Sequence, residues 1–220
     1  MLVFPHENGP TMLSPTQERI PLTADLQFSK RSWRKLLAEF HIPLKYLPVY
    51  VLLSVYFVYA IYRYFDLNGE YSTVLWYIHG VFHEVGHAVT RWAGDTICIL
   101  SGTVFQLLTP IACGIYFWRS HEKHAVLMTI GWLGFALLDS ATYMRDAVEM
   151  QLQLVAPFVS SDDLIHDWNW LFTHWGILRH ANTIGMVVEV LGVMAVVISL
   201  LLIIIAALPW RREDELLPSP

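Results

Sequence analysis

The stretch that decides the fold is residues 184–208, IGMVVEVLGVMAVVISLLLIIIAAL, in which Glu189 is the only charged side chain. A helix of about 20 predominantly apolar residues spans the hydrocarbon core of a bilayer. A surface helix of a soluble protein carries charged residues along one face, and this segment has no such face. It therefore predicts a transmembrane helix, and we expect an integral membrane protein in contact with the lipid bilayer.

Four further segments have a similar length and composition. The first carries only Arg63, the third carries no charge, and the fourth carries only Asp139. The sequence thus predicts an all-α integral membrane protein with about five transmembrane helices. The expected spans are residues 46–65, 71–92, 97–118, 125–143 and 184–208, with a long loop at 146–183.

The overall composition supports the same class of protein. Of the 220 residues, 55% are hydrophobic and 15% are charged, whereas about 25% of the residues of a soluble domain are charged. The formal net charge of -5 argues against a nucleic-acid-binding protein, which usually has a basic face. Two cysteines are too few for a disulfide framework or a zinc site built from cysteines.

One membrane domain, residues 46–208, is expected between two polar ends. Residues 1–45 predict a mobile tail with a basic juxtamembrane segment, and residues 209–220 predict a short C-terminal tail. Basic residues beside a span stay in the cytoplasm, so we expect a cytoplasmic N-terminus, and the absence of a signal peptide pattern favours a bacterial inner membrane. Five spans would then place Arg211 and Arg212 outside, which conflicts with the same rule.

The second predicted span holds the main chemical signal, His83-Glu84-Val85-Gly86-His87. Two histidines four residues apart lie on one face of a helix, where their ring nitrogens can bind one zinc ion. Glu84 can take a proton from a zinc-bound water, whose pKa falls to about 7. Burying a carboxylate at membrane depth costs roughly 2.5–3.5 kcal/mol, so the presence of Glu84 in this span indicates a functional site. Gly86 would let another backbone approach closely.

A zinc ion held by two histidines and a water needs one more protein ligand. Asp139 is the first candidate, because the second and fourth spans run in the same direction and its depth matches that of the motif, toward the cytoplasmic side. The metal site would then lie between these two spans. Asp146 and His166 are alternatives. The aromatic stretch that begins with His166 and Asp167 either folds back over the site or anchors at the headgroups.

Residues 82–88, FHEVGHA, together with Leu138-Asp139, resemble the motifs of the site-2 proteases, a family of intramembrane zinc metalloproteases (peptidase M50-like). The resemblance covers residues 74 to 145. It implies a fold of three core spans with additional helices and an enzyme that cleaves a membrane-protein substrate.

For the site, the same resemblance implies that His83 and His87 bind Zn²⁺, that Glu84 is the general base and that Asp139 is the third ligand. The chain also departs from the family. Ser140 stands where the family has a glycine, and the segment from Gly94 to Gly102 leaves room for at most one short strand, where the family often has a longer insert.

Other functions remain open at this point. A non-proteolytic metal or ion site would serve transport, sensing or an inactive protease homologue, for example as an ion path through Glu84, Asp139 and Glu189. A di-iron enzyme would need about eight histidines with adjacent pairs, and this sequence has no His-His dipeptide. The histidine pairs that superficially fit it are His79/His83, His83/His87 and His121/His124.

Overall fold

The computed structural model describes residues 38–66, 73–152 and 165–208, and every regular element in these ranges is helical. The predicted all-α class is therefore confirmed. The expected tails lie almost entirely outside the described residues, as do residues 153–164 of the expected loop. The main helices are α2 (Leu47–Asp66), α3 (Val74–Thr90), α4 (Asp95–Arg119), α5 (Lys123–Arg145), α6 (Asp167–His174) and α7 (Ala181–Ala207), with single turns η1 (Leu44–Tyr46), η2 (Arg91–Ala93) and η4 (Leu178–His180) between them.

Four of the five predicted spans correspond to stretches long and apolar enough to cross a membrane. These stretches are Leu44–Asp66, Asp95–Arg119, Lys123–Arg145 and Leu178–Ala207. The helix of the remaining predicted span, α3, has 17 residues and falls outside this group within the described chain. The chain thus has the features of a membrane protein, and α3 is the helix in which it departs from the simple pattern of five full spans.

Local interactions define both ends of α3, and a tight turn connects it to α4. The Thr73 side chain caps the start of α3 by accepting a hydrogen bond from the Trp76 backbone N–H, at 3.2 Å. After α3 the chain passes through η2 and reverses at Gly94, whose φ of 89° suits glycine. Residues 95–102 then form the first turns of α4, so the short strand considered for this segment is replaced by helix.

Helices α2, α3 and α5 all run in the same direction. Tyr50, near the start of α2, belongs to the same apolar cluster as Leu127 near the start of α5. Further along, the Thr142 hydroxyl near the end of α5 donates to the Tyr64 hydroxyl near the end of α2, at 3.3 Å. Helix α3 follows the same course, because His79 contacts Asp139, and His83, one turn later on α3, lies beside Tyr143, one turn later on α5.

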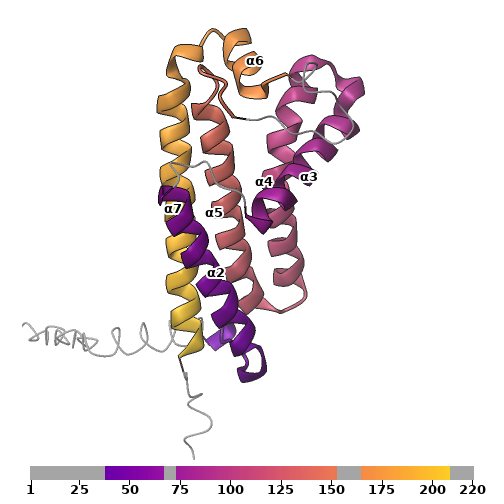
Figure 1. Ribbon diagram of the computed structural model, residues 1–220. Helices are drawn as coiled ribbons and strands as arrows, with labels where there is room; N and C mark the ends of the chain where they lie inside the picture. Colours follow the sequence, from indigo (N-terminus) through magenta and orange to yellow (C-terminus); the bar gives the residue numbers. More distant parts are fainter. Residues whose placement is uncertain (1–37, 67–72, 153–164, 209–220) are drawn as a thin grey trace, which may run out of the picture.

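This parallel arrangement corrects the expected alternation of five spans. The backbone N–H of Ile42, before α2, donates to the carbonyl of Ala206 at the end of α7, at 3.1 Å. The first and last described helices therefore meet at one end of the bundle, the lower end in Figure 1. An alternating five-span chain would have its ends on opposite sides. Arg211 and Arg212 lie outside the described residues, but the chain leaves α7 at the end of the bundle where it entered α2.

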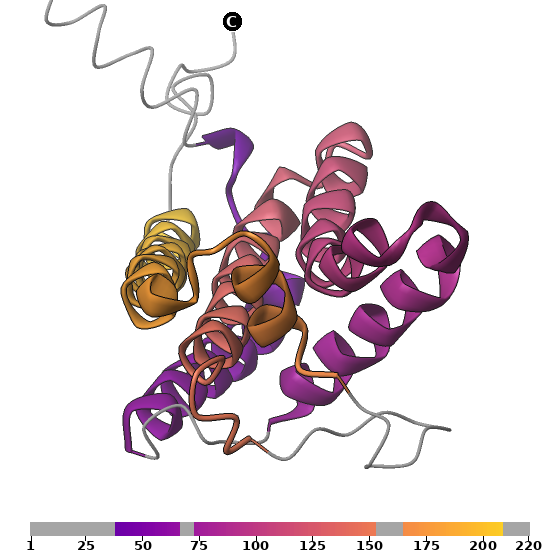
Figure 2. The same cartoon turned by 90° about the horizontal axis from the view of Figure 1, so that it is seen from above.

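The core lies where α2 and α7 pack against α5. Phe57, Phe135 and Val196 come from these three helices and form one buried apolar cluster. Glycines bring α5 and α7 close together, since a Cβ built on Gly134 would lie 2.8 Å from the Gly192 carbonyl oxygen. Seen from above, α3 and α4 lie to one side of this group and α6 lies across the end of the bundle between them (Figure 2).

Candidate metal centre

Three side chains from two helices converge at the upper end of the bundle. The Nε2 atoms of His83 and His87 lie 2.8 and 3.1 Å from one carboxylate oxygen of Asp167, Oδ2. His83 and His87 are on the same face of α3, as their spacing predicts, and Asp167 is the first residue of α6. The stretch that begins at His166 therefore folds back over the motif, which was one of the two outcomes expected for it.

Glu84 joins the two histidines from the same helix. One potential ligand atom from each of His83, Glu84 and His87 lies within 4.8 Å of the others, and all three side chains are partly buried. Carboxylate and imidazole groups at this spacing are able to share one metal ion and a water molecule. The sequence motif is thus assembled as a compact group in the folded chain.

Close contact between α3 and α4 places the α4 backbone beside the His83–Glu84–His87 group. A Cβ built on Gly86 would lie only 2.3 Å from the Ser101 carbonyl oxygen, so the prediction that Gly86 allows another backbone to approach is confirmed. Gly102 on α4 plays a second role that the sequence analysis did not identify. A Cβ there would lie 2.6 Å from the Nε2 atoms of both His83 and His87. A larger residue at this position would push against both nitrogens, so the absence of a side chain at Gly102 leaves room beside them.

Hydrogen bonding fixes the orientation of the His87 ring. Its Nδ1 lies 2.8 Å from the Cys98 carbonyl oxygen and must donate to it, because a carbonyl only accepts. A neutral His87 then has no second N–H, and its Nε2 presents a lone pair toward Asp167. A backbone carbonyl on the far nitrogen is the usual partner of a metal-binding histidine.

The start of α6 is held in place by the end of α5. Tyr143 accepts a hydrogen bond from the Asp167 backbone N–H at 3.0 Å, and the Asn169 side chain donates to the Ala147 carbonyl at 2.7 Å. His166 caps α6, because its Nδ1 accepts the Asn169 backbone N–H at 3.2 Å. These contacts position the Asp167 carboxylate over the two histidines.

Asp146 and His166, the two alternative third ligands, contact each other. His166 uses Nδ1 as an acceptor, so its Nε2 carries the proton and donates to Asp146 Oδ2 at 3.2 Å. Burial lowers the pKa of His166 despite the nearby carboxylate of Asp146. This hydrogen bond from neutral His166 to the Asp146 carboxylate stabilises the connection between α5 and α6.

The electrostatics of Asp167 match its surroundings. Burial raises the pKa of this carboxyl, but the neighbouring His83 and His87 side chains outweigh burial and leave the pKa below its usual value. Asp167 is therefore an anion that faces two imidazole nitrogens. One carboxylate and two imidazole nitrogens that converge on one point are groups able to share a metal cation, and this donor set is one that zinc accepts.

Asp139, the predicted third ligand, is held by a different histidine. Its Oδ2 contacts Nδ1 of His79, one turn before His83 on α3. Trp132 donates its indole N–H to His79 Nε2 at 2.9 Å. An indole is only a donor, so His79 Nε2 is unprotonated and Nδ1 donates to Asp139. His79 therefore holds Asp139 through a hydrogen bond, and the assignment of Asp139 as a ligand stays a prediction.

The remaining ionisable groups from the sequence analysis lie apart from this centre. Glu189 on α7 forms an ion pair with Arg145, with 2.6 Å between Oε2 and Nη1. His124 contacts Tyr50 at the opposite end of the bundle, and His121 is exposed in the turn that precedes α5. The described chain therefore does not bring His121 and His124 to the motif, as a di-iron site would need.

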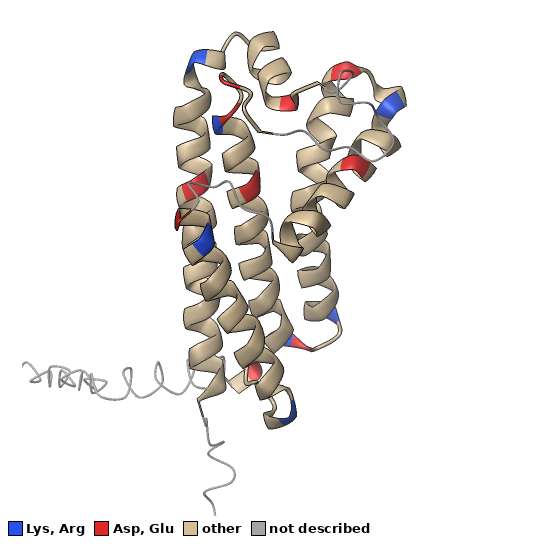
Figure 3. Cartoon of the chain, in the orientation of Figure 1, with Lys and Arg blue, Asp and Glu red and all other residues tan. Residues whose placement is uncertain are grey.

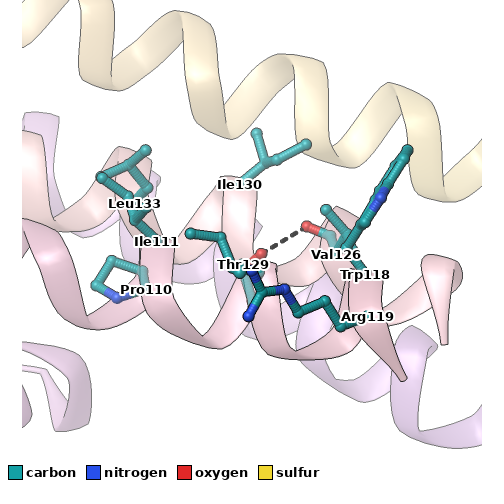
Figure 4. A pocket seen from close by; sticks show the side chains of 10 residues that line it. Pro110, Ile111, Trp118, Arg119, Val126, Thr129, Ile130 and Leu133 are labelled. Carbon is teal, nitrogen blue, oxygen red and sulfur yellow. Dashed lines mark hydrogen bonds between the residues drawn. The ribbon is translucent and has the colours of Figure 1, made fainter. Parts of the chain in front are cut away.

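An apolar groove of about 330 Å³ runs between α4 and α5, away from the His83–Glu84–His87 group. Its lining includes Pro110, Ile111 and Leu133, with Arg119 at one end (Figure 4). The Thr129 hydroxyl donates to the Val126 carbonyl within its own helix at 2.8 Å, so it is already paired. This surface is suited to contact with lipid chains and offers no comparable set of metal ligands.

Comparison with known proteins adds no relative. No protein-family model, curated protein or solved structure matches this chain.

Proposed function

We propose that this protein is an intramembrane zinc metallopeptidase that hydrolyses a peptide bond of a membrane protein. The single observation that carries the proposal is the convergence of His83 Nε2 and His87 Nε2 on one oxygen of Asp167, with Glu84 beside them. Two imidazoles, a carboxylate ligand and an adjacent general base form the set of groups used by zinc hydrolases.

We assign the zinc ligands as His83, His87 and Asp167. When bound, the metal supplies a Lewis acid and an activated water at neutral pH. Asp167 is favoured over Asp139 as third ligand because it contacts both histidines, whereas the Asp139 carboxylate contacts His79. Glu84 is the general base in this assignment. It accepts the proton of the attacking water and returns it to the leaving amine.

The membrane arrangement that fits this function has four full spans and a shorter fifth helix. Helices α2, α4, α5 and α7 are the spans, and α3 carries the motif alongside α4 and α5. A cytoplasmic N-terminus and a bacterial inner membrane remain our proposal for location, supported by the basic residues before α2. The sequence motif that resembles site-2 proteases supports the same class of reaction.

The test combines metal content and hydrolysis in detergent-purified protein. We expect about one zinc per chain and cleavage of fluorescein-labelled casein by the wild type. Glu84→Gln should keep the zinc and lower the cleavage rate about 10²–10⁴-fold, because it removes the general base and retains the metal ligands. Glu149→Gln is the matched control, since Glu149 is exposed and outside the site, and it should leave both values unchanged.

Three results would contradict the proposal in different ways. Absence of zinc in the wild type would remove the metal site. Full activity of Glu84→Gln would remove the assigned mechanism. Zinc binding without hydrolysis by the wild type would favour the second reading from the sequence, a metal-binding membrane protein that is not a protease.

A further inference from the structure

We propose that the site cleaves its substrate at the non-cytoplasmic boundary of the membrane, in an extended segment that flanks a transmembrane helix. This inference rests on the proposed function and adds the side, the depth and the substrate class. It replaces the expectation from the sequence that the site lies toward the cytoplasmic side.

The depth follows from the helix ends beside the site. The His83 ring lies against Tyr143, two residues before the end of α5. His87 contacts the carbonyl of Cys98, three residues after the start of α4. At 1.5 Å per residue these positions are roughly 3 to 5 Å from the helix ends. The metal ligands therefore lie at the rim of the bundle, where the hydrocarbon region gives way to the headgroups.

The short helix α6 supports this depth. It starts with Asp167 at the site and lies across the upper end of the bundle (Figure 2). Trp168 is buried against the helix ends, whereas Trp175 just after α6 is 42% exposed. Tryptophans at such positions are typical of the interface between lipid and water. The cover of the site is thus an interfacial helix, and water has a short path to it.

The side follows from the direction of α3. Because α3 runs parallel to α2, its C-terminal half with the motif points away from the end where Ile42 meets Ala206. The first and last described residues of the bundle are therefore on one side and the metal ligands are on the other. An alternating five-span chain would have placed the motif and the N-terminus together.

The charges show which side is cytoplasmic. The described helices have basic residues at both ends (Figure 3), so the flanking sequence decides the balance. The positive-inside rule counts lysines and arginines close to the ends of spans. By sequence order, Lys30, Arg31, Arg34 and Lys35 precede α2 and Arg211 and Arg212 follow α7, and Lys45, Arg119 and Lys123 lie at the same end of the helices. At the end with the site they are Arg63, Arg91, Arg145 and Arg179.

The substrate class follows from depth and side together. A peptide inside the hydrocarbon core must keep its backbone hydrogen bonds, so a transmembrane helix resists cleavage there. At the rim, water satisfies the groups that an extended peptide exposes. The site is therefore matched to the segment of a membrane protein that emerges on the non-cytoplasmic face.

Cysteine labelling tests the side. In a background of Cys98→Ala and Cys113→Ala, we place one cysteine at Thr173, exposed in α6, or at Ser120, exposed between α4 and α5. A membrane-impermeant maleimide should label Thr173→Cys in intact bacterial cells that express the chain. It should label Ser120→Cys only after permeabilisation. The reverse pattern, or equal labelling of both in intact cells, would overturn the inference.

Vesicles test from which side of the membrane an extended peptide reaches the site. Fluorescein-labelled casein cannot cross a membrane, so right-side-out vesicles should cleave it and inverted vesicles should not, with Glu84→Gln as the inactive control. Cleavage only in inverted vesicles, or in neither type when the detergent-solubilised protein is active, would overturn the inference. Loss of casein cleavage in detergent as well would instead contradict the proposed function, and the labelling result would still stand.

Discussion

Glycines hold the α5–α7 pair and the α3–α4 pair of helices close together, but the side chains around the two contacts differ in polarity. In both pairs a glycine brings two backbones together. A Cβ on Gly192 would lie 2.9 Å from the Gly134 carbonyl oxygen, and a Cβ on Gly86 would lie 2.3 Å from the Ser101 carbonyl oxygen. Small residues at such crossings are typical of helices packed within membranes.

The two pairs differ in what surrounds the close contact. Around Gly134 and Gly192 the neighbours are Phe135, Leu138 and Val196, all buried and apolar. Around Gly86 and Gly102 the neighbours are the imidazoles of His83 and His87 and the hydroxyl of Thr90, which hydrogen-bonds to Ser101 at 2.7 Å. The first contact lies in apolar packing, and the second lies beside polar side chains near the upper end of the bundle. The predictions below separate these two roles.

The largest effect is expected at the carboxylate that contacts both histidines. Asp167→Asn removes the charge of the assigned ligand and should reduce zinc from about one per chain to a small fraction of that. Asp139→Asn is the matched change, because an asparagine carbonyl still accepts the His79 hydrogen bond, and it should keep the zinc. Elemental analysis of both purified variants gives the comparison. Zinc lost only in Asp139→Asn would restore the ligand set predicted from the sequence.

The two glycine contacts should respond oppositely to the same substitution. Gly102→Ala pushes a methyl group against the far ends of His83 and His87, so zinc affinity should fall while the melting temperature changes little. Gly134→Ala meets the Gly192 carbonyl and Val196, and such overpacking costs about 1–3 kcal/mol.

Thermal unfolding in detergent and zinc titration of both glycine variants provide the measurement. We expect Gly134→Ala to unfold at a lower temperature and to bind zinc as the wild type does. Gly80→Ala is the control, because a Cβ there has no neighbour within 4 Å. Equal loss of zinc in Gly102→Ala and Gly134→Ala would show that the two contacts do not have separate roles.

The smallest effect is expected at Asp146, which supports the position of α6 beside the site. Asp146 accepts hydrogen bonds from His166 and from the backbone of Gln151 and Leu152, and so fixes the start of α6. Asp146→Ala should weaken zinc binding about 10–100-fold, as loss of supporting hydrogen bonds does at metal sites. Asp146→Asn keeps acceptor capacity and should recover part of this affinity. The visible spectrum of bound Co²⁺ should change in Asp146→Ala, and an unchanged spectrum and affinity would exclude a positioning role.

Local patterns in the sequence predicted much of this site. The spacing of His83 and His87 places both on one helix face, and the side-chain positions of a single helix depend only on that spacing. The small side chain of Gly86 predicted a close backbone contact, which α4 makes. Four of the predicted spans coincide with helices long and apolar enough to cross a membrane, because apolar length is a property of each segment alone.

Local patterns could not predict which carboxylate contacts the two histidines, nor the direction of α3. Asp139 and Asp167 are separated from the motif by different stretches of chain, and sequence distance does not say which of them reaches His83. Hydropathy gives the length of a helix but not its direction, so α3 was counted as a full antiparallel span. The turn at Gly94 and the contacts of α3 with α5 decide its direction.

The sequence by itself determined an all-helical chain suited to a membrane, with one helix that presents His83, Glu84 and His87 together. These properties follow from residue type and helical period. Only the tertiary structure decided that Asp167 faces the two imidazoles, that Gly102 leaves room beside their nitrogens, and that the site and the contact between Ile42 and Ala206 lie at opposite ends of the bundle. Each of these depends on contacts between helices, which form where whole faces of side chains fit together.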